Sequence, residues 1–173
     1  FGVPEAAVVE TTLKTLIERF RSKPEWQHAD PAVRADAVLR LPSSEHEVLL
    51  ALAREDADPR VRRAAVKKLS DTAGLIEIVA SEADVGVRDE AEGRLAHIAA
   101  HEHDEAAARA AVAGLRDTKH LAAVAKAAPL AATREAAIRA IADPRSLAAV
   151  VRESEDTPTR LLAETGRQLG NRG

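Results

Sequence analysis

The 173-residue sequence has no cysteine, no methionine and no tyrosine, and its aromatic side chains are limited to two Phe and one Trp. Without cysteine the chain can form no disulfide, thiol nucleophile or thiolate metal site, which is typical of a cytoplasmic protein. No apolar run approaches the roughly 20 residues of a membrane span, so we expect no membrane contact. Because large rings normally fill a core, this chain must bury Ala, Leu, Val and Ile, and such side chains let helices approach closely.

The chain also lacks an excess of charge of one sign and any familiar catalytic motif. It carries 25 basic and 28 acidic residues, a net charge of −3, whereas a duplex-binding surface normally shows a clear basic excess. We therefore expect no nucleic-acid partner. The sequence has no Gly-rich phosphate loop and no G-x-S-x-G motif, and its carboxylates fall at helix starts and on helix faces. We expect no enzymatic activity and no cofactor.

An internal repeat of the form Asp-x-x-Val-Arg-x-x-Ala-Val-x-x-Leu runs along the chain. It begins at Asp30 and Asp58, continues in degraded form at Asp84, and has weaker copies around Arg134 and Arg160. Asp is a preferred helix N-cap, Pro after it suits the first turn, and apolar residues every four positions form one stripe. Helices of a second type begin at Asp71, Asp117 and Asp143, and residues 43–54 fill the first such place. The pattern predicts alternating first and second helices.

This pattern resembles the HEAT-like repeat family, in its short bacterial form related to the bilin-lyase type, over roughly residues 29–169. The sequence KPEWQH at residues 23–28 also resembles the start of the HEAT-like region in large bacterial proteins of the domain-of-unknown-function-349 family. Both resemblances imply protein binding or scaffolding and bring no catalytic residues. We predict an all-α fold, a right-handed α-solenoid of about five to six helix pairs whose second helices line a concave face.

The sequence divides into two parts. We expect residues 1–24 to form an N-terminal capping helix, since apolar residues at positions 9, 13, 16 and 20 make a narrow seam; the alternative is that this seam packs on another chain. Residues 25–173 form the predicted repeat array, with Trp26 covering its first end. The chain starts at Phe1 and its last unit has no second helix, so we expect it to be part of a longer protein.

The repeat is irregular near residues 84–116. The next capping residue after Asp84 is Asp104, which comes too early for a complete helix pair, so the unit has lost its second helix or fused it into a longer one. The stretch also holds His97, His101 and His103. His97 and His101 lie one helical turn apart and with a carboxylate could hold Zn²⁺. We favour the alternative of an exposed polar helix end and predict no metal site.

Charged residues supply the candidates for function. Arginines recur at one repeat position, and we predict that they tie repeats together through Asp side chains and helix-end carbonyls: Arg34, Arg62, Arg88, Arg134 and Arg160. The outward positions of the second helices are the predicted partner-binding residues: Glu47, Arg54, Glu77, Lys119, His120, Lys126, Arg145 and Arg152. Their sign runs from mostly acidic to basic along the chain, which predicts a protein partner with the opposite gradient.

The predicted function is therefore that of a non-enzymatic scaffold. One alternative is an accessory or bilin-lyase-like protein that acts on a chromophore-bearing partner, and another is a HEAT-like nucleic-acid binder. A short basic cluster is predicted to be a solvated face, with a docking patch for an acidic partner as the alternative. Its members are Arg60, Arg62, Arg63, Lys67 and Lys68.

Overall fold

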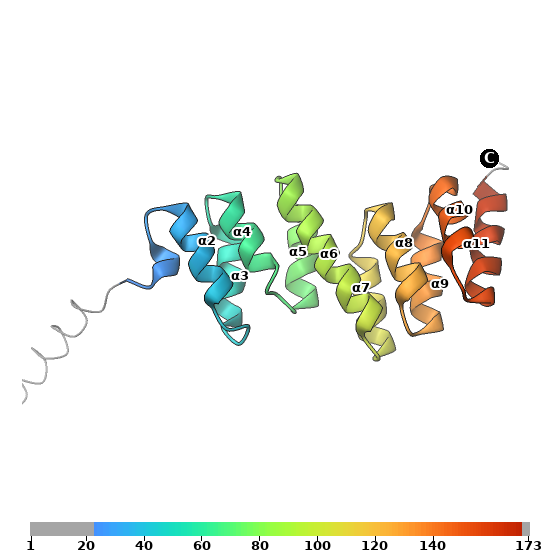
Figure 1. Ribbon diagram of the computed structural model, residues 1–173, viewed down its shortest axis with the longest axis horizontal. Coiled ribbons are helices and arrows are strands. Elements are labelled where there is room, and N and C mark those ends of the chain that lie inside the picture. Colours follow the sequence, from blue (N-terminus) through green and yellow to red (C-terminus); the bar gives the residue numbers. More distant parts are fainter. Residues whose placement is uncertain (1–22, 171–173) are drawn as a thin grey trace, which may run out of the picture.

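The computed structural model describes residues 23–170, which form short helices stacked side by side along one axis (Figure 1). All secondary structure in this part of the chain is helical, as the sequence predicts. A short 3-10 helix, η1 (Glu25–Gln27), comes first. The α-helices that follow are α2 (Pro31–Arg40), α3 (His46–Glu55), α4 (Pro59–Val66), α5 (Thr72–Ser81), α6 (Val85–His101), α7 (Glu105–Ala113), α8 (Thr118–Ala127), α9 (Ala131–Ala140), α10 (Pro144–Glu153) and α11 (Thr157–Gly170).

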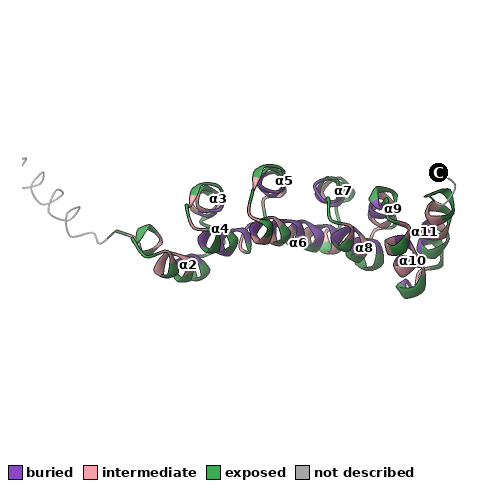
Figure 2. Cartoon of the chain, turned by 90° about the horizontal axis from the view of Figure 1, so that it is seen from above, coloured by how far each residue is buried: buried purple, intermediate pink, exposed green. Residues whose placement is uncertain are grey.

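The helices form two rows. α2, α4, α6, α8 and α10 pack successively on one another in what we call the inner row, and α3, α5, α7, α9 and α11 do the same in the outer row. The rows lie against each other, since α3 packs on α4, α5 on α6, α8 on α9 and α10 on α11. Seen from above, the rows arch gently, with the inner row on the inside of the curve (Figure 2). Each helix therefore has one face toward the opposite row and one free face.

Aspartate side chains start most of the helices. The carboxylate of Asp30 accepts a hydrogen bond from the backbone N–H of Ala32, and a cap of this kind contributes about 1 kcal/mol. Neither Glu45, before α3, nor Leu130, before α9, caps its helix with its side chain. The same capping bond is made by Asp58, Asp71, Asp84, Asp104, Asp117 and Asp143. The predicted capping role of the recurring Asp is confirmed at these positions.

The core between the rows consists of small aliphatic side chains. Leu49 of α3, Val61 of α4 and Leu75 of α5 are fully buried, and alanines lie between such residues along the whole stack. Trp26 is partly buried and packs against the core, in η1, which contacts α2. It covers the first end of the stack, as predicted.

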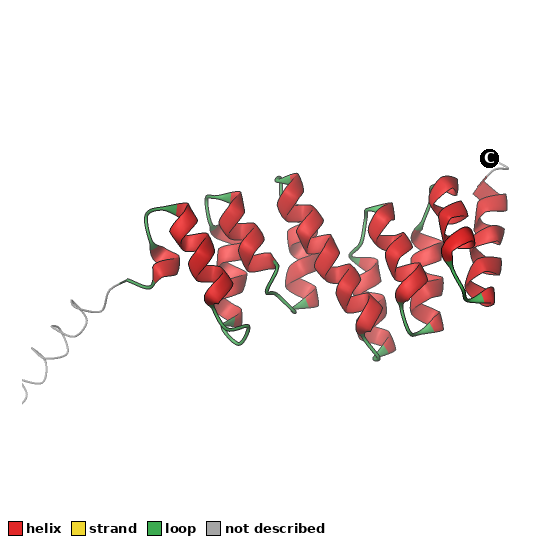
Figure 3. Ribbon diagram, viewed as in Figure 1, coloured by secondary structure: helices red, strands yellow, loops and turns green. Residues whose placement is uncertain are grey.

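α6 changes the relation between helix type and row. It is one continuous helix of 17 residues, across the place where the sequence predicts a lost or fused second helix. Before it, the first helices of the repeats (α2, α4) lie in the inner row. After it, the first helices (α7, α9, α11) lie in the outer row, and the second helices (α8, α10) lie in the inner row (Figure 3). The types exchange rows because fusing two helices removes one reversal of the chain.

Among the described helices, none combines the length and the apolar character that crossing a membrane requires. The amphipathic seam predicted over residues 5–20 lies outside the described residues.

Candidate partner-binding surface

The recurring arginines lie where consecutive helices of one row meet. Arg34 of α2 donates from Nε and Nη2 to both carboxylate oxygens of Asp56, each at 2.8 Å, and from Nη1 to backbone carbonyls ahead of α2. Arg62 of α4 repeats this arrangement with Glu82, at 2.8 and 2.9 Å. The carboxylate that pairs with each arginine precedes the capping Asp of the following helix in the row.

The same tie recurs later in the stack, with two interruptions. Arg134 of α9 donates to the hydroxyl of Thr159 at 3.0 Å and lies 3.5 Å from Asp156, ahead of α11. Arg88 of α6 donates to a backbone carbonyl, and Arg160 of α11 to a hydroxyl; neither forms an ion pair among residues 23–170. The predicted structural role is therefore confirmed for the first two repeats and for α9. Arg88 lacks the ion pair because α6 runs through the position where a boundary between two helices would supply its carboxylate.

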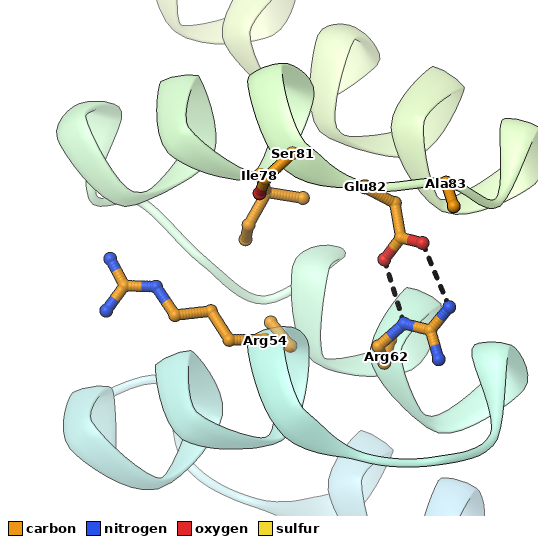
Figure 4. A pocket seen from close by; sticks show the side chains of 7 residues that line it. Arg54, Arg62, Ile78, Ser81, Glu82 and Ala83 are labelled. Carbon is orange, nitrogen blue, oxygen red and sulfur yellow. Dashed lines mark hydrogen bonds and ion pairs between the residues drawn. The ribbon is translucent and has the colours of Figure 1, made fainter.

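A cavity of about 270 Å³ lies beside the second of these ties (Figure 4). The side chains of Arg62 and Glu82 face each other on one side of it, while Arg54 extends toward the other side. The hydrogen bonds from Arg62 lower the pKa of Glu82, and Glu82 raises the pKa of Arg62, so both remain charged at neutral pH. The lining residues are Ala53, Arg54, Arg62, Ile78, Ser81, Glu82 and Ala83.

The predicted partner-binding residues do not share one face. Because the helix types exchange rows at α6, the residues on α3 and α5 lie in the outer row, and those on α8 and α10 lie in the inner row. The predicted concave face of second helices is therefore divided between the two rows. Those in the outer row are Glu47, Arg54 and Glu77, and those in the inner row are Lys119, His120, Lys126, Arg145 and Arg152.

This division changes the meaning of the charge gradient. The acidic members of the set, Glu47 and Glu77, are on the outer row, whereas the exposed bases Lys119, Arg145 and Arg152 are on the inner row. A trend that runs along the sequence becomes a contrast between two faces of the folded protein.

His120 corrects one prediction. It is only 9% exposed, so its predicted outward position is wrong. Its Nε2 lies 3.0 Å from the carboxylate of Asp89 in α6. Gly93 of α6 lies beside the ring, where an added Cβ would make an ordinary van der Waals contact at 3.6 Å. The hydrogen bond from His120 and a second one from Lys119 lower the pKa of Asp89, so this carboxylate stays ionised.

Three carboxylates of the inner row are each shared by two basic side chains. Glu90 of α6 lies 3.0 Å from Arg63 of α4 and 3.9 Å from Lys67, the residue after α4. Asp89 is shared by Lys119 and His120 in the same manner. Farther along, Glu153 of α10 lies 2.7 Å from Lys126 and 3.9 Å from Arg152. In the outer row the ion pairs Arg54–Glu77, Arg109–Glu105, Arg139–Glu135 and Arg167–Glu164 each join one base to one acid. Within their bounds, the inner-row helices hold 11 Arg and Lys against five Asp and Glu, and the outer-row helices hold six against six, so the excess of positive charge lies on the inner row.

The histidine-rich end of α6 forms a stacked pair. The rings of His97 and His101 have centroids 4.2 Å apart, so they share a face as predicted, and Nδ1 of His101 lies 2.8 Å from the backbone oxygen of His97. Burial and the neighbouring charge of His101 lower the pKa of His97. His103 lies in the loop after α6. Within residues 23–170 no three His, Cys, Asp or Glu residues gather where they could hold a metal ion.

Sequence reasoning missed the role of Glu92. This side chain is 5% exposed and accepts hydrogen bonds from the backbone N–H groups of Arg116 and Asp117, at 3.1 and 2.7 Å. It therefore fixes the start of α8 against α6. The signal was its place at an apolar position of the repeat, which indicates a buried carboxylate but does not identify the donors it meets.

A comparison with known proteins finds no family model that matches this chain and no curated protein with significant similarity.

Proposed function

We propose that this chain is a non-enzymatic protein-binding scaffold, built as a right-handed α-solenoid of HEAT-like helix pairs. The observation that carries the proposal is the inner row, whose helices bring their free faces together along the inside of one arch. A stack of short helix pairs buries its core between neighbours and leaves a long continuous surface, which such proteins use to hold a partner.

Small side chains on the inner row support this use. Ala32 of α2 and Ala123 of α8 are exposed, and Ala149 of α10 is partly exposed. Side chains of this size let the backbone of a partner come close to the helix. Ion pairs between successive helices hold the row in a fixed arrangement, so a partner meets a preformed surface and less ordering entropy is lost on binding.

The proposal is tested by blocking one face at a time without changing charge. In one variant, Ala123→Gln and Ala149→Gln place longer uncharged side chains on the inner row. In the matched variant, Ala80→Gln and Ala110→Gln do so at exposed positions of α5 and α7 in the outer row. Immobilised wild-type chain and both variants are incubated with lysate of the native organism, and retained proteins are identified by mass spectrometry.

We expect a protein retained by the wild-type chain and the outer-row variant to be lost from the inner-row variant. Partners that all three proteins retain equally would contradict an inner-row binding surface, as would partners lost only from the outer-row variant. Circular dichroism of the three proteins shows whether the substitutions have left the helices intact.

A further inference from the structure

Four bases on α8 and α10 form a platform on the inner row. They occupy equivalent positions of successive second helices: Lys119 and Lys126 on α8, Arg145 and Arg152 on α10. Seven residues along a helix span about 10 Å, and adjacent packed helices lie about 8–10 Å apart. The backbone positions of the four bases therefore lie near the corners of a square roughly 10 Å on each side. We call this set the basic platform.

The centre of the basic platform is shallow and apolar. Between the bases lie Ala122 and Ala123 of α8 and Ala148 and Ala149 of α10, all exposed or partly exposed. The bases at the edge reach into solvent, since the side chains of Lys119 and Arg152 are 69% and 70% exposed. A polypeptide can thus lie across the alanines with its side chains directed toward the corners.

The charges follow the face of the protein and not the repeat position. In α5, a second helix of the outer row, the positions equivalent to the platform bases are Ala73 and Ala80, and in α3 they are Glu47 and Arg54. Paired bases appear at these positions only in the two second helices that lie in the inner row. Arg54 of α3 pairs with Glu77 of α5, so a single base at these positions can join helices of the outer row, whereas a base at both positions is confined to α8 and α10 among the described second helices.

The four bases of the platform form ion pairs with only two acids. Lys119 pairs with Asp89, and Lys126 shares Glu153 with Arg152. Arg145 forms no ion pair among residues 23–170; it lies near Asp143, whose pKa its charge helps to lower. The hydrogen bond from Lys126 lowers the pKa of Glu153, so that acid remains ionised and one base of the pair stays unmatched. A ligand that brings two or more carboxylates completes the pairing.

We propose that the basic platform binds an acidic segment of a partner polypeptide; this rests on the scaffold function proposed above. The segment places carboxylates about 10 Å apart, at positions i and i+7 of a helix or three residues apart in an extended strand. Nucleic acid fits less well, because the chain carries 25 basic and 28 acidic residues, whereas a duplex-binding protein normally shows a clear basic excess. Trp26, the single Trp, lies in η1 at the other end of the stack. It therefore cannot stack with a nucleobase of a nucleic acid bound at the platform.

The test measures fluorescence anisotropy of a labelled alanine-rich peptide of about 18 residues, long enough to form a helix, with Glu at positions seven apart. A second peptide has Gln in place of each Glu, and a labelled DNA duplex is the third probe. The platform variant is Arg145→Glu with Arg152→Glu. The matched variant, Arg109→Glu with Arg139→Glu, makes the same change of charge at exposed arginines of the outer row.

We expect the wild-type chain and the outer-row variant to bind the Glu peptide, and the platform variant to bind it roughly tenfold more weakly, since exposed charge contacts contribute modestly. The Gln peptide should not bind, and the affinity for the Glu peptide should fall between about 50 and 500 mM salt, because salt screens exposed charges.

Equal binding of the Glu peptide by both variants would overturn the platform, and binding of the duplex in preference to the Glu peptide would overturn its assignment to an acidic polypeptide. The two proposals fail separately. If a lysate partner is lost from the inner-row variant (Ala123→Gln with Ala149→Gln) and the Glu peptide does not bind, the scaffold function is supported and the binding of an acidic segment is contradicted. If the Glu peptide binds but no lysate protein is retained, the binding of an acidic segment is supported and the scaffold function is contradicted.

Discussion

At the residue scale, arginine has two distinct roles that differ in exposure. The side chain of Arg62 is 16% exposed and bonded through two nitrogens to Glu82, whereas that of Arg152 is 70% exposed and 3.9 Å from Glu153. Exposed ion pairs contribute roughly 0–1 kcal/mol, but removing one partner of a shielded pair leaves the other charge unmatched. Stability should therefore depend on Arg62 and its equivalents, and binding on Arg152 and its neighbours.

We predict that Glu82→Gln lowers the free energy of unfolding at pH 7 by about 1–3 kcal/mol, because Arg62 loses its ionised partner while still shielded from water. The pKa of Glu82 lies below its ordinary value of 4.5, chiefly through the hydrogen bond from Arg62. A lowered carboxyl pKa gives stability that is complete above the ordinary value and is lost as the pH falls through the folded-state value. Urea unfolding at pH 7 and at about pH 3 should show the difference between the proteins shrink at the lower pH.

Glu47→Gln is the control, since Glu47 is exposed on α3, and it should unfold like the wild-type chain at both pH values. If Glu82→Gln were as stable as Glu47→Gln at pH 7, the arginine ties would not stabilise the stack.

At the scale of the helix, α11 differs from the first helices before it. In α9, on which α11 packs, the apolar residues Ile138 and Ile141 are buried. The equivalent positions of α11 hold Glu164 and Arg167, whose side chains pair with each other. The hydrogen bond from Arg167 is the main reason that the pKa of Glu164 is lowered to about 2. The face of α11 that corresponds to the stacking face of α9 is thus polar.

We predict that Glu164→Ile with Arg167→Ile makes the protein self-associate, because it restores the apolar pattern of α9 on a face that no described helix covers. Sedimentation velocity should show a concentration-dependent rise in the sedimentation coefficient. The matched double substitution Glu135→Ile with Arg139→Ile removes another local ion pair, on α9. Equal association of the two variants would mean that added apolar surface alone, and not the stacking position, is responsible.

Helices and caps could be predicted from the sequence because both depend on neighbouring residues. The Asp at each start and the four-residue apolar spacing identify a helix locally, as at Asp58 and Val61. The row to which a helix belongs depends on how often the chain reverses before it, and the fused α6 removes one reversal. Predicting the surface from repeat position therefore failed for α3 and α5. His120 was misplaced because its buried position depends on a contact with Asp89 of another helix, which repeat position does not reveal.

At the scale of the whole molecule, contacts join near neighbours only. Most contacts between the two halves run through α6, and α5 also packs on α7. Helix α6 packs on α4, α5, α7 and α8, whereas α10 packs on α8 and α11. In a stack of this kind stability is approximately a sum of units and their interfaces. A destabilising substitution in α6 should therefore promote local unfolding of helices on both sides of it, and one in α10 should do so mainly toward the C-terminal end of the stack.

We predict that Leu95→Ala in α6 and Leu147→Ala in α10 each lower the free energy of unfolding by about 2–5 kcal/mol. The two substitutions should differ in which helices they destabilise. Both side chains are buried leucines, at 0% and 3% exposure. Hydrogen exchange measured by mass spectrometry should accelerate from α4 to α8 in the first variant, and from α8 to α11 in the second. The same pattern of exchange in both variants would show that the stack unfolds as one indivisible unit.

The exchange of rows at α6 has a consequence for how a chain of this kind grows by duplication. A helix pair copied ahead of α6 brings its second helix into the outer row, whereas the same pair copied after α8 brings it into the inner row. Identical added sequences would thus present their side chains to opposite sides of the protein. In such a lineage, the position at which a repeat is inserted decides its binding partner as much as its sequence does.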